Sequence, residues 1–416
     1  MKKVIICAGA LLCGAAMFAQ DNKVTGTQHD TGASTVDAYQ AGKENNAAIN
    51  QNDGTKLVSN SDQYGEGNKV VVDQTGTENT SDIIQEGGEV NFAKVDQMDL
   101  GNMSTIIQGT GMAAVNNRAV VTQSGSSDVS LGNESMITQT YDQSKAVVDQ
   151  TGDQNMATVT QVGKPNQPGA PNMRFPRNEV DIDQIGERNT AITMQESYDV
   201  SMGKNWAKVY TEGSDNLAWV KQAATQENKA SINQNSVFAE AFIEQTSDGN
   251  TATIDQKADD ADLTAGTGDV AYVLQMGGTG NSALVKQESV EPYGNPGSYA
   301  YVEQDGSDNS VKVDHQSGRG QEAWVRQEGS DNSTKLNQGA NSQYADILQM
   351  GAGNSVDLSQ GIHQQDAWIT QNGDGNIVNY TQSGGGTSDL KVLQEDVVGS
   401  TTLDLTPEAR IKPSGY

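Results

Sequence analysis

Three kinds of side chain in this sequence could take part in chemistry: histidines, carboxylates and amides. The histidines, His29, His315 and His363, lie far apart, and none has the spacing of a metal-ligand pair. Carboxylates are plentiful, but no pair recurs in an apolar context that would shift a pKa for acid–base hydrolysis. The sequence also lacks a Gly-x-Ser-x-Gly elbow, a phosphate-binding loop and a dinucleotide fingerprint. It therefore predicts no catalytic residue, metal ligand or cofactor site, and we do not expect an enzyme.

Turns rich in Asp, Gly and Asn raise a calcium-binding alternative, because carboxylate and amide oxygens are the ligands of this ion. Examples are TSDGN at 246–250 and NGDGN at 372–376, and GGTGNSAL at 277–284 is a near match to a calcium-binding nonapeptide. In that match, however, Asn281 stands where an aspartate is needed. Such sites also need tandem copies in which adjacent turns share an ion, and this match is single. Calcium is therefore the weaker interpretation, and no metal is expected.

The amides, in contrast, recur with a regular period. The segment AVVDQTGDQNMATVTQ at 146–161 has two glutamines 11 residues apart with an asparagine between them, and AWITQNGDGNIVNYTQ at 367–382 repeats the arrangement. About 29 units of this kind occur between Ser34 and Gln394. Self-similarity at a fixed period indicates a repeat protein, in which stacked units build one continuous core.

Within each unit, small, aliphatic and amide residues alternate with variable ones. Asn250, Ala252, Ile254 and Gln256 are two residues apart, so they would share one face of a β-strand. The intervening positions accept Trp, Lys, Asp or Thr without a rule. We therefore expect the regular face to be buried and the variable face to be exposed to water.

A short turn joins the strands, with the pattern Gln-x-Gly-x-x-Asn. It occurs as QTGTEN at 74–79 and as QEGSDN at 327–332, among others. Gly, Asp and Asn supply the left-handed or strained backbone that a four-residue reversal requires. The glycines predicted to form these turns are Gly152, Gly186, Gly306, Gly329, Gly351 and Gly373.

One such strand pair cannot bury its apolar row alone, so it must stack on copies of itself. Stacking at ~4.8 Å places each strand beside its copy and lets each Gln or Asn amide bond to the amides above and below. An unpaired buried amide costs on the order of 1–3 kcal/mol, so the amides fix the register while the aliphatic residues supply cohesion. The residues predicted to form this ladder for self-assembly are Ser144, Gln150, Asn155, Gln161, Gln184, Asn189, Gln195, Gln245, Asn250, Gln256, Gln304, Asn309, Gln327, Asn332, Gln338, Gln349, Asn354, Gln360, Gln371, Asn376 and Gln382.

The composition supports a solenoid over a conventional globule. Only 34% of the 416 residues are hydrophobic, and the formal net charge is −28, which on its own would suggest disorder. The regular spacing of Val, Ile and Leu argues against disorder, and a solenoid needs only a thin buried row in each coil. We therefore predict an all-β protein, a single elongated β-solenoid of stacked strand-turn-strand coils of about 22 residues. The negative charge disfavours nucleic acid and anionic membranes as partners.

The N-terminus is typical of a secretory signal peptide, which we place at residues 1–19. Lys2 and Lys3 precede an apolar stretch that is shorter than the ~20 residues a membrane helix needs. Both cysteines, Cys7 and Cys13, lie in this segment, so the mature chain would contain no disulfide. After removal of the signal peptide we expect no membrane insertion.

The repeat resembles the curlin repeat of bacterial curli-type amyloid subunits, Ser-x5-Gln-x-Gly-x-x-Asn-x-Ala-x3-Gln. The block SKAVVDQTGDQNMATVTQ, which begins at Ser144, matches every position, whereas the block from Ser298 has Val311 for the alanine and His315 for the last glutamine. The resemblance implies a secreted subunit that polymerises into extracellular fibres for biofilm matrix and adhesion. It implies curli-type secretion and nucleation proteins as partners, besides the protein itself. It also implies an extracellular or cell-surface location on a Gram-negative-type bacterium.

Two further features leave alternatives open. His315 is either a substituted ladder residue or part of a one-residue bulge that restores Gln316 to the ladder. Trp219, Trp324 and Trp368 stand at variable positions three residues before a glutamine, with Phe242, Tyr272 and Tyr301 in equivalent places. Stacked aromatic side chains there could bind sugar polymers or a neighbouring filament, or they could pack across strands and stiffen the solenoid.

The predicted organisation has four parts. A segment at 20–33 follows the signal peptide, the repeats occupy 34–394, and a tail at 395–416 with Pro407 and Pro413 leaves the repeat. Loop insertions are expected near 163–176, 257–269 and 288–298. The predicted function is a self-assembling fibre subunit, with a monomeric surface β-solenoid adhesin that binds glycans or another surface as the alternative.

Overall fold

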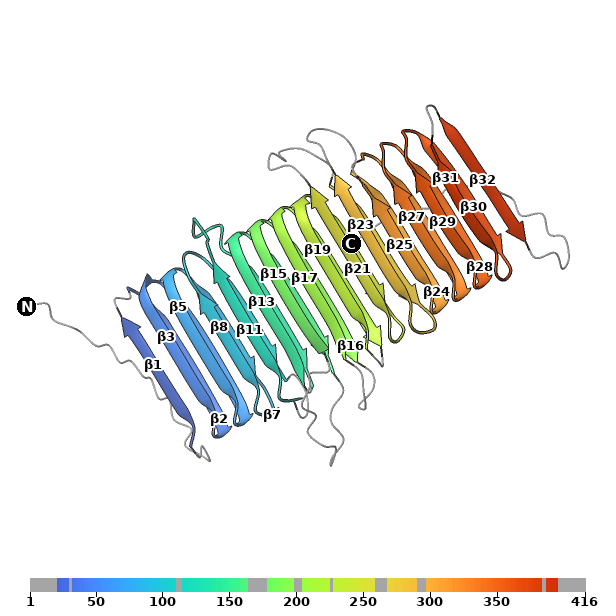
Figure 1. The fold of residues 1–416 in the computed structure, drawn as a ribbon. Coiled ribbons are helices and arrows are strands. Elements are labelled where there is room, and N and C mark those ends of the chain that lie inside the picture. Colours follow the sequence, from blue (N-terminus) through green and yellow to red (C-terminus); the bar gives the residue numbers. More distant parts are fainter. Residues whose placement is uncertain are drawn as a thin grey trace, which may run out of the picture.

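The chain folds into an elongated stack of β-strands (Figure 1), here described from a computed structural model. The description covers residues 21–29, 32–109, 114–141, 143–163, 178–197, 204–224, 227–258, 268–289, 297–316, 318–383 and 387–395. The predicted signal peptide lies outside these residues, as do most of the three predicted insertions and of the C-terminal tail. The described ranges contain no helix that is long and apolar enough to cross a membrane.

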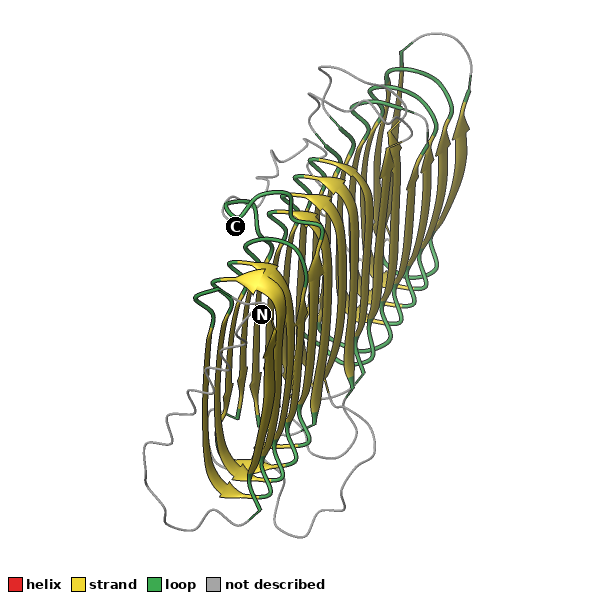
Figure 2. Cartoon of the chain, turned by 90° about the vertical axis from the view of Figure 1, so that its left-hand side faces the viewer, coloured by secondary structure: helices red, strands yellow, loops and turns green. Residues whose placement is uncertain are grey.

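The predicted fold class is confirmed, because the described residues form a parallel β-solenoid of about 14 turns with no helix. The chain alternates between two parallel sheets that face one another, as the view in Figure 2 shows. We call the 15-stranded sheet sheet 1 and the 17-stranded sheet sheet 2. Each coil contributes one long strand to each sheet, so every strand is hydrogen-bonded to strands of the neighbouring coils.

Sheet 1 contains β8 and the odd-numbered strands other than β7 and β9. Its strands are β1 (Lys23–His29), β3 (Asn46–Thr55), β5 (Lys69–Thr77), β8 (Phe92–Gln97), β11 (Arg118–Ser124), β13 (Ser144–Asp153), β15 (Asn178–Glu187), β17 (Asn205–Ser214), β19 (Lys229–Val237), β21 (Thr251–Ala258), β23 (Ser282–Ser289), β25 (Ser310–His315), β27 (Ser333–Gln338), β29 (Ser355–Gln360) and β31 (Ile377–Gln382). The first strand, β1, precedes the expected start of the repeats at Ser34 and pairs with β3 like any other member of the sheet.

Sheet 2 contains the other strands, of which β7 and β10 are two-residue pieces at a corner. Its strands are β2 (Thr35–Lys43), β4 (Val58–Glu66), β6 (Thr80–Gln85), β7 (Gly88–Glu89), β9 (Met103–Gln108), β10 (Ala114–Val115), β12 (Glu134–Thr140), β14 (Met156–Val162), β16 (Thr190–Ser197), β18 (Leu217–Ala224), β20 (Glu240–Gln245), β22 (Val270–Met276), β24 (Tyr299–Ser307), β26 (Glu322–Ser330), β28 (Tyr344–Ala352), β30 (Gln365–Asn372) and β32 (Ser388–Glu395).

The coils are in register along both sheets, so equivalent repeat positions lie beside one another. In the pairing of β13 with β15, Val148 lies opposite Ile182 and Gln150 lies opposite Gln184. This register follows from the period-two pattern, because a slip of one residue would turn every buried side chain to the outside. The in-register stack therefore forms columns of like residues that run the length of the rod.

The core lies between the two sheets and consists of two aliphatic rows from each. Ala146 and Val148 of β13 are fully buried, as are Ala191 of β16 and Ile182 of β15. The connected cluster of buried aliphatic residues runs from Ala47 to Val378 without leaving the interior. Each coil buries little apolar surface alone, so the stacking of the coils is what keeps water from the core.

The tight turns change edge along the rod, which explains the irregular pairing of repeat units that the sequence shows near 195–234. In the coils around β13 to β18, the tight turns lead from sheet 1 to sheet 2, and the longer connections return at 163–177 and 198–204. In the coils from β24 onward, the tight turns lead from sheet 2 to sheet 1. The coils around β13 to β18 and those from β24 onward therefore present their tight turns on opposite edges, whereas the first coils have tight turns on both edges, as between β2 and β3 and between β3 and β4.

Candidate assembly site: the amide columns

The glutamines predicted to form one ladder separate into two columns, one at the end of each sheet's strands. All of them are buried, with at most 4% of their surface exposed. The predicted glutamines in sheet 1 are Gln150, Gln184, Gln256, Gln338, Gln360 and Gln382. Those in sheet 2 are Gln161, Gln195, Gln245, Gln304, Gln327, Gln349 and Gln371. The interior positions that the ladder requires are thus occupied by these side chains.

The sheet-2 glutamine column is an unbroken chain of hydrogen bonds from Gln40 to Gln394. In each step the Nε2 group of one glutamine donates to the Oε1 atom of the next glutamine toward the C-terminus, at 2.6 to 3.0 Å. Every step points the same way, so the column has a polarity. Aligned amides polarise one another, which strengthens the bonds in such a chain.

The same amide nitrogens also tie the two sheets together. The second hydrogen of Gln150 Nε2 goes to the carbonyl oxygen of Glu134 in the opposite sheet at 3.0 Å, and that of Gln161 goes to the carbonyl oxygen of Lys145 at 2.9 Å. The Nε2 group of Gln327 likewise donates to the carbonyl oxygen of Ser310 at 3.1 Å. Each glutamine therefore closes its own coil as well as bonding to the next one, a role that the repeat pattern alone does not reveal.

The sheet-1 glutamine column is interrupted at two positions. Thr211 is the register partner of Gln184 and Gln234, and His315 is the register partner of Gln287 and Gln338. Among the described residues, the Thr211 hydroxyl, both ring nitrogens of His315 and the Oε1 atoms of Gln234 and Gln338 have no hydrogen-bond partner. Each interruption therefore leaves the next glutamine toward the C-terminus, Gln234 or Gln338, without an amide donor for its Oε1 atom. Of the two alternatives for His315, the structure shows the substituted ladder residue, since Gln316 is exposed.

Burial controls the protonation of His315. The side chain is fully buried, and this burial lowers its pKa to about 3, although the neighbouring Asp314 carboxylate acts in the opposite direction. The imidazole is therefore neutral at physiological pH. A neutral ring next to two amides has one donor and one acceptor, but neither is used here.

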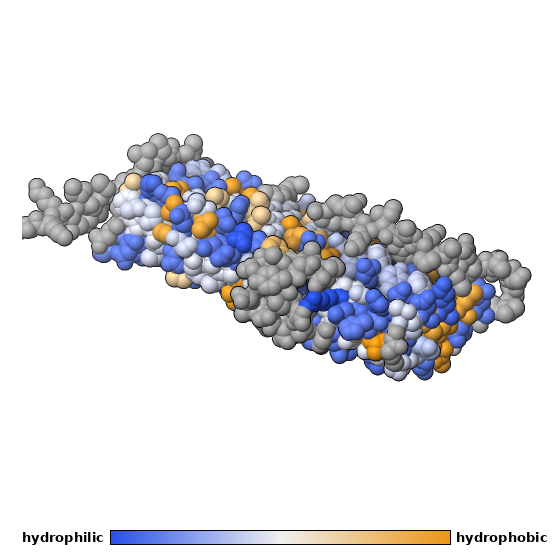
Figure 3. Space-filling model, turned by 90° about the horizontal axis from the view of Figure 1, so that it is seen from above, coloured by the Kyte–Doolittle hydropathy of each residue, from blue (hydrophilic) through white to orange (hydrophobic). Residues whose placement is uncertain are grey.

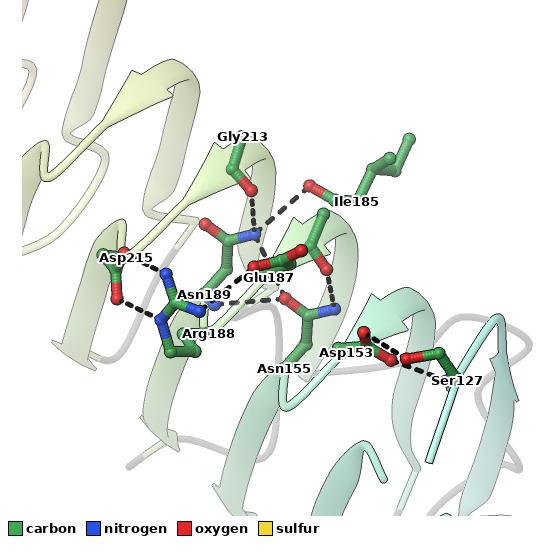
Figure 4. A network of polar contacts seen from close by, with 10 residues as sticks. Ser127, Asp153, Asn155, Ile185, Glu187, Arg188, Asn189, Gly213 and Asp215 are labelled. Carbon is green, nitrogen blue, oxygen red and sulfur yellow. Dashed lines mark hydrogen bonds and ion pairs between the residues drawn. The ribbon is translucent and has the colours of Figure 1, made fainter. Parts of the chain in front are cut away.

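Two asparagine columns run along the two edges at the start of the strands, and Figure 4 shows the contacts of Asn155 and Asn189 in one of them. Asn155 Oδ1 accepts hydrogen bonds from the backbone N–H and the Nδ2 group of Asn189, both at 3.1 Å. Asn189 Nδ2 in turn donates to the carbonyl oxygens of Ile185 in its own turn and Gly213 in the next coil, at 3.2 and 3.0 Å. These bonds cap backbone groups that the turn would otherwise leave unpaired.

The remaining predicted asparagines belong to the other edge, before strands of sheet 1. Within this column the Oδ1 atom of one asparagine accepts the backbone N–H of the next, for example Asn309 from Asn332 and Asn332 from Asn354, both at 3.1 Å. The predicted members of this column are Asn250, Asn309, Asn332, Asn354 and Asn376. Ser144 occupies the same column, where its backbone N–H donates to Asn117 Oδ1 at 2.9 Å.

The turn glycines form two columns, one on each edge, in which the backbones of successive coils approach closely. Gly152, Gly186, Gly306, Gly329, Gly351 and Gly373 have φ angles between 103° and 126°. A Cβ atom on Gly329 would lie 2.2 Å from the carbonyl oxygen of Gly351. Only glycine meets both conditions. The residue before the asparagine is also left-handed, with φ of 57° at Asp331, and the sequence pattern gave no rule for that position.

The variable outer face is not uniformly exposed to water, and the expectation that it would be is wrong for several aromatic residues. Only 9% of Trp219, 6% of Phe242 and 6% of Trp324 is exposed. The rings pack along sheet 2, with the Phe242 and Tyr272 rings stacked at a centroid distance of 4.6 Å. Burial of ring faces against neighbours fits the cross-strand packing role better than a sugar-binding role.

A row of carboxylates on the outer face of sheet 1 repels itself. Partial burial and the nearby carboxylates of Asp149 and Asp181 raise the pKa of Asp183, with Lys208 acting in the opposite direction. On sheet 2, burial and the carboxylates of Asp37 and Asp82 likewise raise the pKa of Asp62. In-register stacking places like charges near one another whenever the same residue recurs in consecutive coils.

The turns considered for calcium are used by the asparagine column instead. Asn281 donates its backbone N–H to Asn250 Oδ1 at 2.9 Å and its Nδ2 group to the carbonyl oxygen of Gly306 at 2.7 Å. Within the ranges that the structure describes, no group of three or more His, Cys, Asp or Glu side chains is arranged to hold a metal ion. The geometry at Asn281 builds a hydrogen-bonded column.

The comparison with known families agrees with the repeat pattern found in the sequence. The family model of the curlin associated repeat matches residues 62–87, which run from the end of β4 through β5 and β6, about one coil of the solenoid. A search of curated proteins finds no match. The resemblance to the curlin repeat is therefore confirmed, and the chain carries the curlin associated repeat at residues 62–87.

Proposed function

We propose that the protein is a secreted structural subunit that stacks end to end into extracellular fibres, which serve in a biofilm matrix and in adhesion. The curlin repeat and the β-solenoid fit a curli-like structural protein. They also fit a bacterial protein of the cell exterior or cell surface. The observation that carries the fibre proposal is that both ends of the rod leave strands that are paired on one side only.

The two ends repeat the interface between coils. In the described part of the chain, β1 and β2 pair only with β3 and β4, while β31 and β32 pair only with β29 and β30. Tyr380 of β31 is 45% exposed, although Leu358 and Leu336 at the equivalent position of the preceding coils are fully buried. Unpaired strand edges are templates for a further strand, so a second copy can continue each sheet.

The polarity of the glutamine columns makes the two ends complementary. At the N-terminal end, Gln28 and Gln40 donate to the next coil, and no described residue donates to their Oε1 atoms. At the C-terminal end, Gln394 donates to the carbonyl oxygen of Ile377, and its second amide hydrogen has no further described coil to meet. Head-to-tail stacking would let the last glutamines of one copy donate to the first glutamines of the next.

The net charge of −28 supports controlled assembly, because it keeps separate chains apart until the strand edges meet. Export of a chain that polymerises requires helpers that keep it unassembled. The proposal therefore includes curli-type secretion and nucleation proteins as partners.

The direct test is fibre formation by the purified mature chain at micromolar concentration. We expect thioflavin-positive fibres whose X-ray diffraction shows a strong meridional reflection at about 4.8 Å. A chain that stays monomeric by analytical ultracentrifugation over several days would contradict the proposal and favour a monomeric adhesin.

A pair of variants at the N-terminal edge tests the end-to-end geometry. The backbone N–H of Lys23 donates toward β3, so the next amide, that of Val24, points to the open side because amides alternate along a strand. Val24→Pro removes this open-side donor and should abolish fibre elongation while the soluble chain keeps its circular dichroism spectrum. Val24→Ala keeps the amide and should elongate at the wild-type rate.

A further inference from the structure

The outer faces of the two sheets differ sharply in charge over four consecutive coils. On β9, β12, β14 and β16 of sheet 2, the three outward positions before each glutamine hold five threonines, four methionines, two isoleucines and Glu134. We call these positions the sheet-2 outer patch. In the same coils of sheet 1, eight of the twelve equivalent positions on β8, β11, β13 and β15 are charged.

The sheet-2 outer patch is accessible. Met103, Met136, Met156 and Met194 are 49%, 41%, 42% and 36% exposed, respectively, which is high for large apolar side chains in the middle of a sheet. The face of the rod seen in Figure 3 is mostly hydrophilic, with apolar side chains in small groups. A face with one charged residue among twelve positions thus stands apart in a chain of net charge −28.

We propose that the sheet-2 outer patch is a lateral contact between two copies of this chain in neighbouring filaments. The inference rests on the proposed fibre function and names the face through which fibres pair. Two copies can bring this face together with only Glu134 to desolvate on each side, whereas the charged face of sheet 1 would bury carboxylates such as Asp181 and Asp183. The rows repeat at the same ~4.8 Å spacing in both copies, so the threonine and methionine side chains can interdigitate.

The size of the patch fits a contact that acts only when it is repeated. Four strands at ~4.8 Å and six residues at ~3.3 Å cover about 400 Å² on each copy. A stable pair of free proteins needs about 800 Å² on each partner, so single chains should stay apart. Along a fibre the same contact recurs in every subunit, and the weak contacts add. The patch also lacks aromatic side chains and cations, which disfavours a sugar polymer as its occupant.

The test compares added negative charge on the two faces of the same coils. Met136→Glu with Thr158→Glu places two charges in the sheet-2 outer patch, and Val120→Glu with Val147→Glu places two at the equivalent positions of sheet 1. We expect both double variants to elongate like the wild type by thioflavin fluorescence. Electron micrographs should show about tenfold fewer paired filaments for the sheet-2 variant only. Unchanged pairing of that variant, or equal loss in both, would overturn the lateral contact and leave the fibre proposal intact.

A second measurement does not depend on fibre growth. Thr158→Cys and Val147→Cys each place one thiol on a chain whose described residues contain no cysteine. Under mild oxidation at high concentration, the soluble Thr158→Cys chain should form disulfide dimers several-fold faster than the Val147→Cys chain. Equal rates would overturn the proposal even if no variant forms fibres, an outcome that would separately overturn the fibre function.

Discussion

His315 lies directly beside Gln338 in the sheet-1 glutamine column, yet neither of its ring nitrogens donates to the Gln338 Oε1 atom. Every position of the sheet-2 glutamine column between Gln40 and Gln394 makes the bond that is missing here. The imidazole fills the place of a glutamine without making its hydrogen bonds, so among the described residues Gln338 Oε1 and both ring nitrogens of His315 have no partner.

Replacement of His315 by glutamine should repair this interruption. His315→Gln can accept from Gln287 and donate to Gln338, which should stabilise the fold by about 1–3 kcal/mol. Protection of the backbone amides from hydrogen exchange should increase most in β25 and β27. A loss of protection in these strands would contradict the ladder geometry.

The same substitution should change the pH dependence. The pKa of His315 is about 3 in the folded chain, below its ordinary value of about 6.5, so the unfolded state binds the proton more readily. Wild-type stability should therefore fall as the pH drops from about 6.5 toward 3, by at most about 1.4 kcal/mol per pH unit. The difference in stability between the His315→Gln variant and the wild type should therefore increase as the pH falls from about 6.5 toward 3. Thr211→Gln, at the other interruption, is the control: its gain should not depend on pH.

A buried hydroxyl in the core offers a second prediction. Thr193 is fully buried between Val159 and Val220, and its hydroxyl has no described partner, so Thr193→Val should raise stability by about 1–2 kcal/mol. The matched control is Thr334, whose hydroxyl donates to Gln349 Oε1 at 2.8 Å. Thr334→Val should lower stability by about 1 kcal/mol. Thermal unfolding followed by circular dichroism measures both, and effects of the same sign would refute the assignment.

The turn glycines differ in how much they tolerate a side chain. Gly329→Ala would combine a φ of 103° with a Cβ atom 2.2 Å from the Gly351 carbonyl oxygen, so we expect a loss of at least about 3 kcal/mol. Gly353 has a φ of 67° and no atom within 4 Å of the Cβ position. Gly353→Ala should therefore cost only about 1 kcal/mol. Equal melting temperatures for the two variants would show that the close approach of the coils does not restrict the side chain at position 329.

Removal of one charge from the carboxylate row on sheet 1 should stabilise the fold at neutral pH. The pKa of Asp183 is raised in the folded chain, mainly by burial and then by Asp149 and Asp181, so its charge opposes folding above that pKa. Asp183→Asn should raise the melting temperature at pH 7, and the gain should disappear well below pH ~3.9, where the wild-type carboxyl is protonated. Asp357→Asn is the control, because Asp357 pairs with Lys335 at 3.1 Å and its removal should give no gain.

Much of this architecture could be predicted because one period of two residues and one turn pattern fix both the strands and their register. Gln150 and Gln184 could be placed beside each other from the repeat alone. The sequence could not show that the tight turns change from one edge of the rod to the other, because the strands of both sheets have the same repeat pattern. It also could not show that Trp219 and Phe242 are buried, since the burial of an outward side chain depends on which residues the stacking brings beside it. His315 was ambiguous for a local reason, as Gln316 follows it.

The change of edge has a consequence for how such a rod can lengthen. Because either sheet accepts any strand of the repeat, insertion or loss of a single half-coil of about 11 residues shifts all later strands to the opposite sheet without breaking a column. The gene can therefore grow by half-turn duplications as well as whole ones. The junction near Gln234 and Gln245, where tight turns occur on both edges in succession, is where such an event would leave its mark.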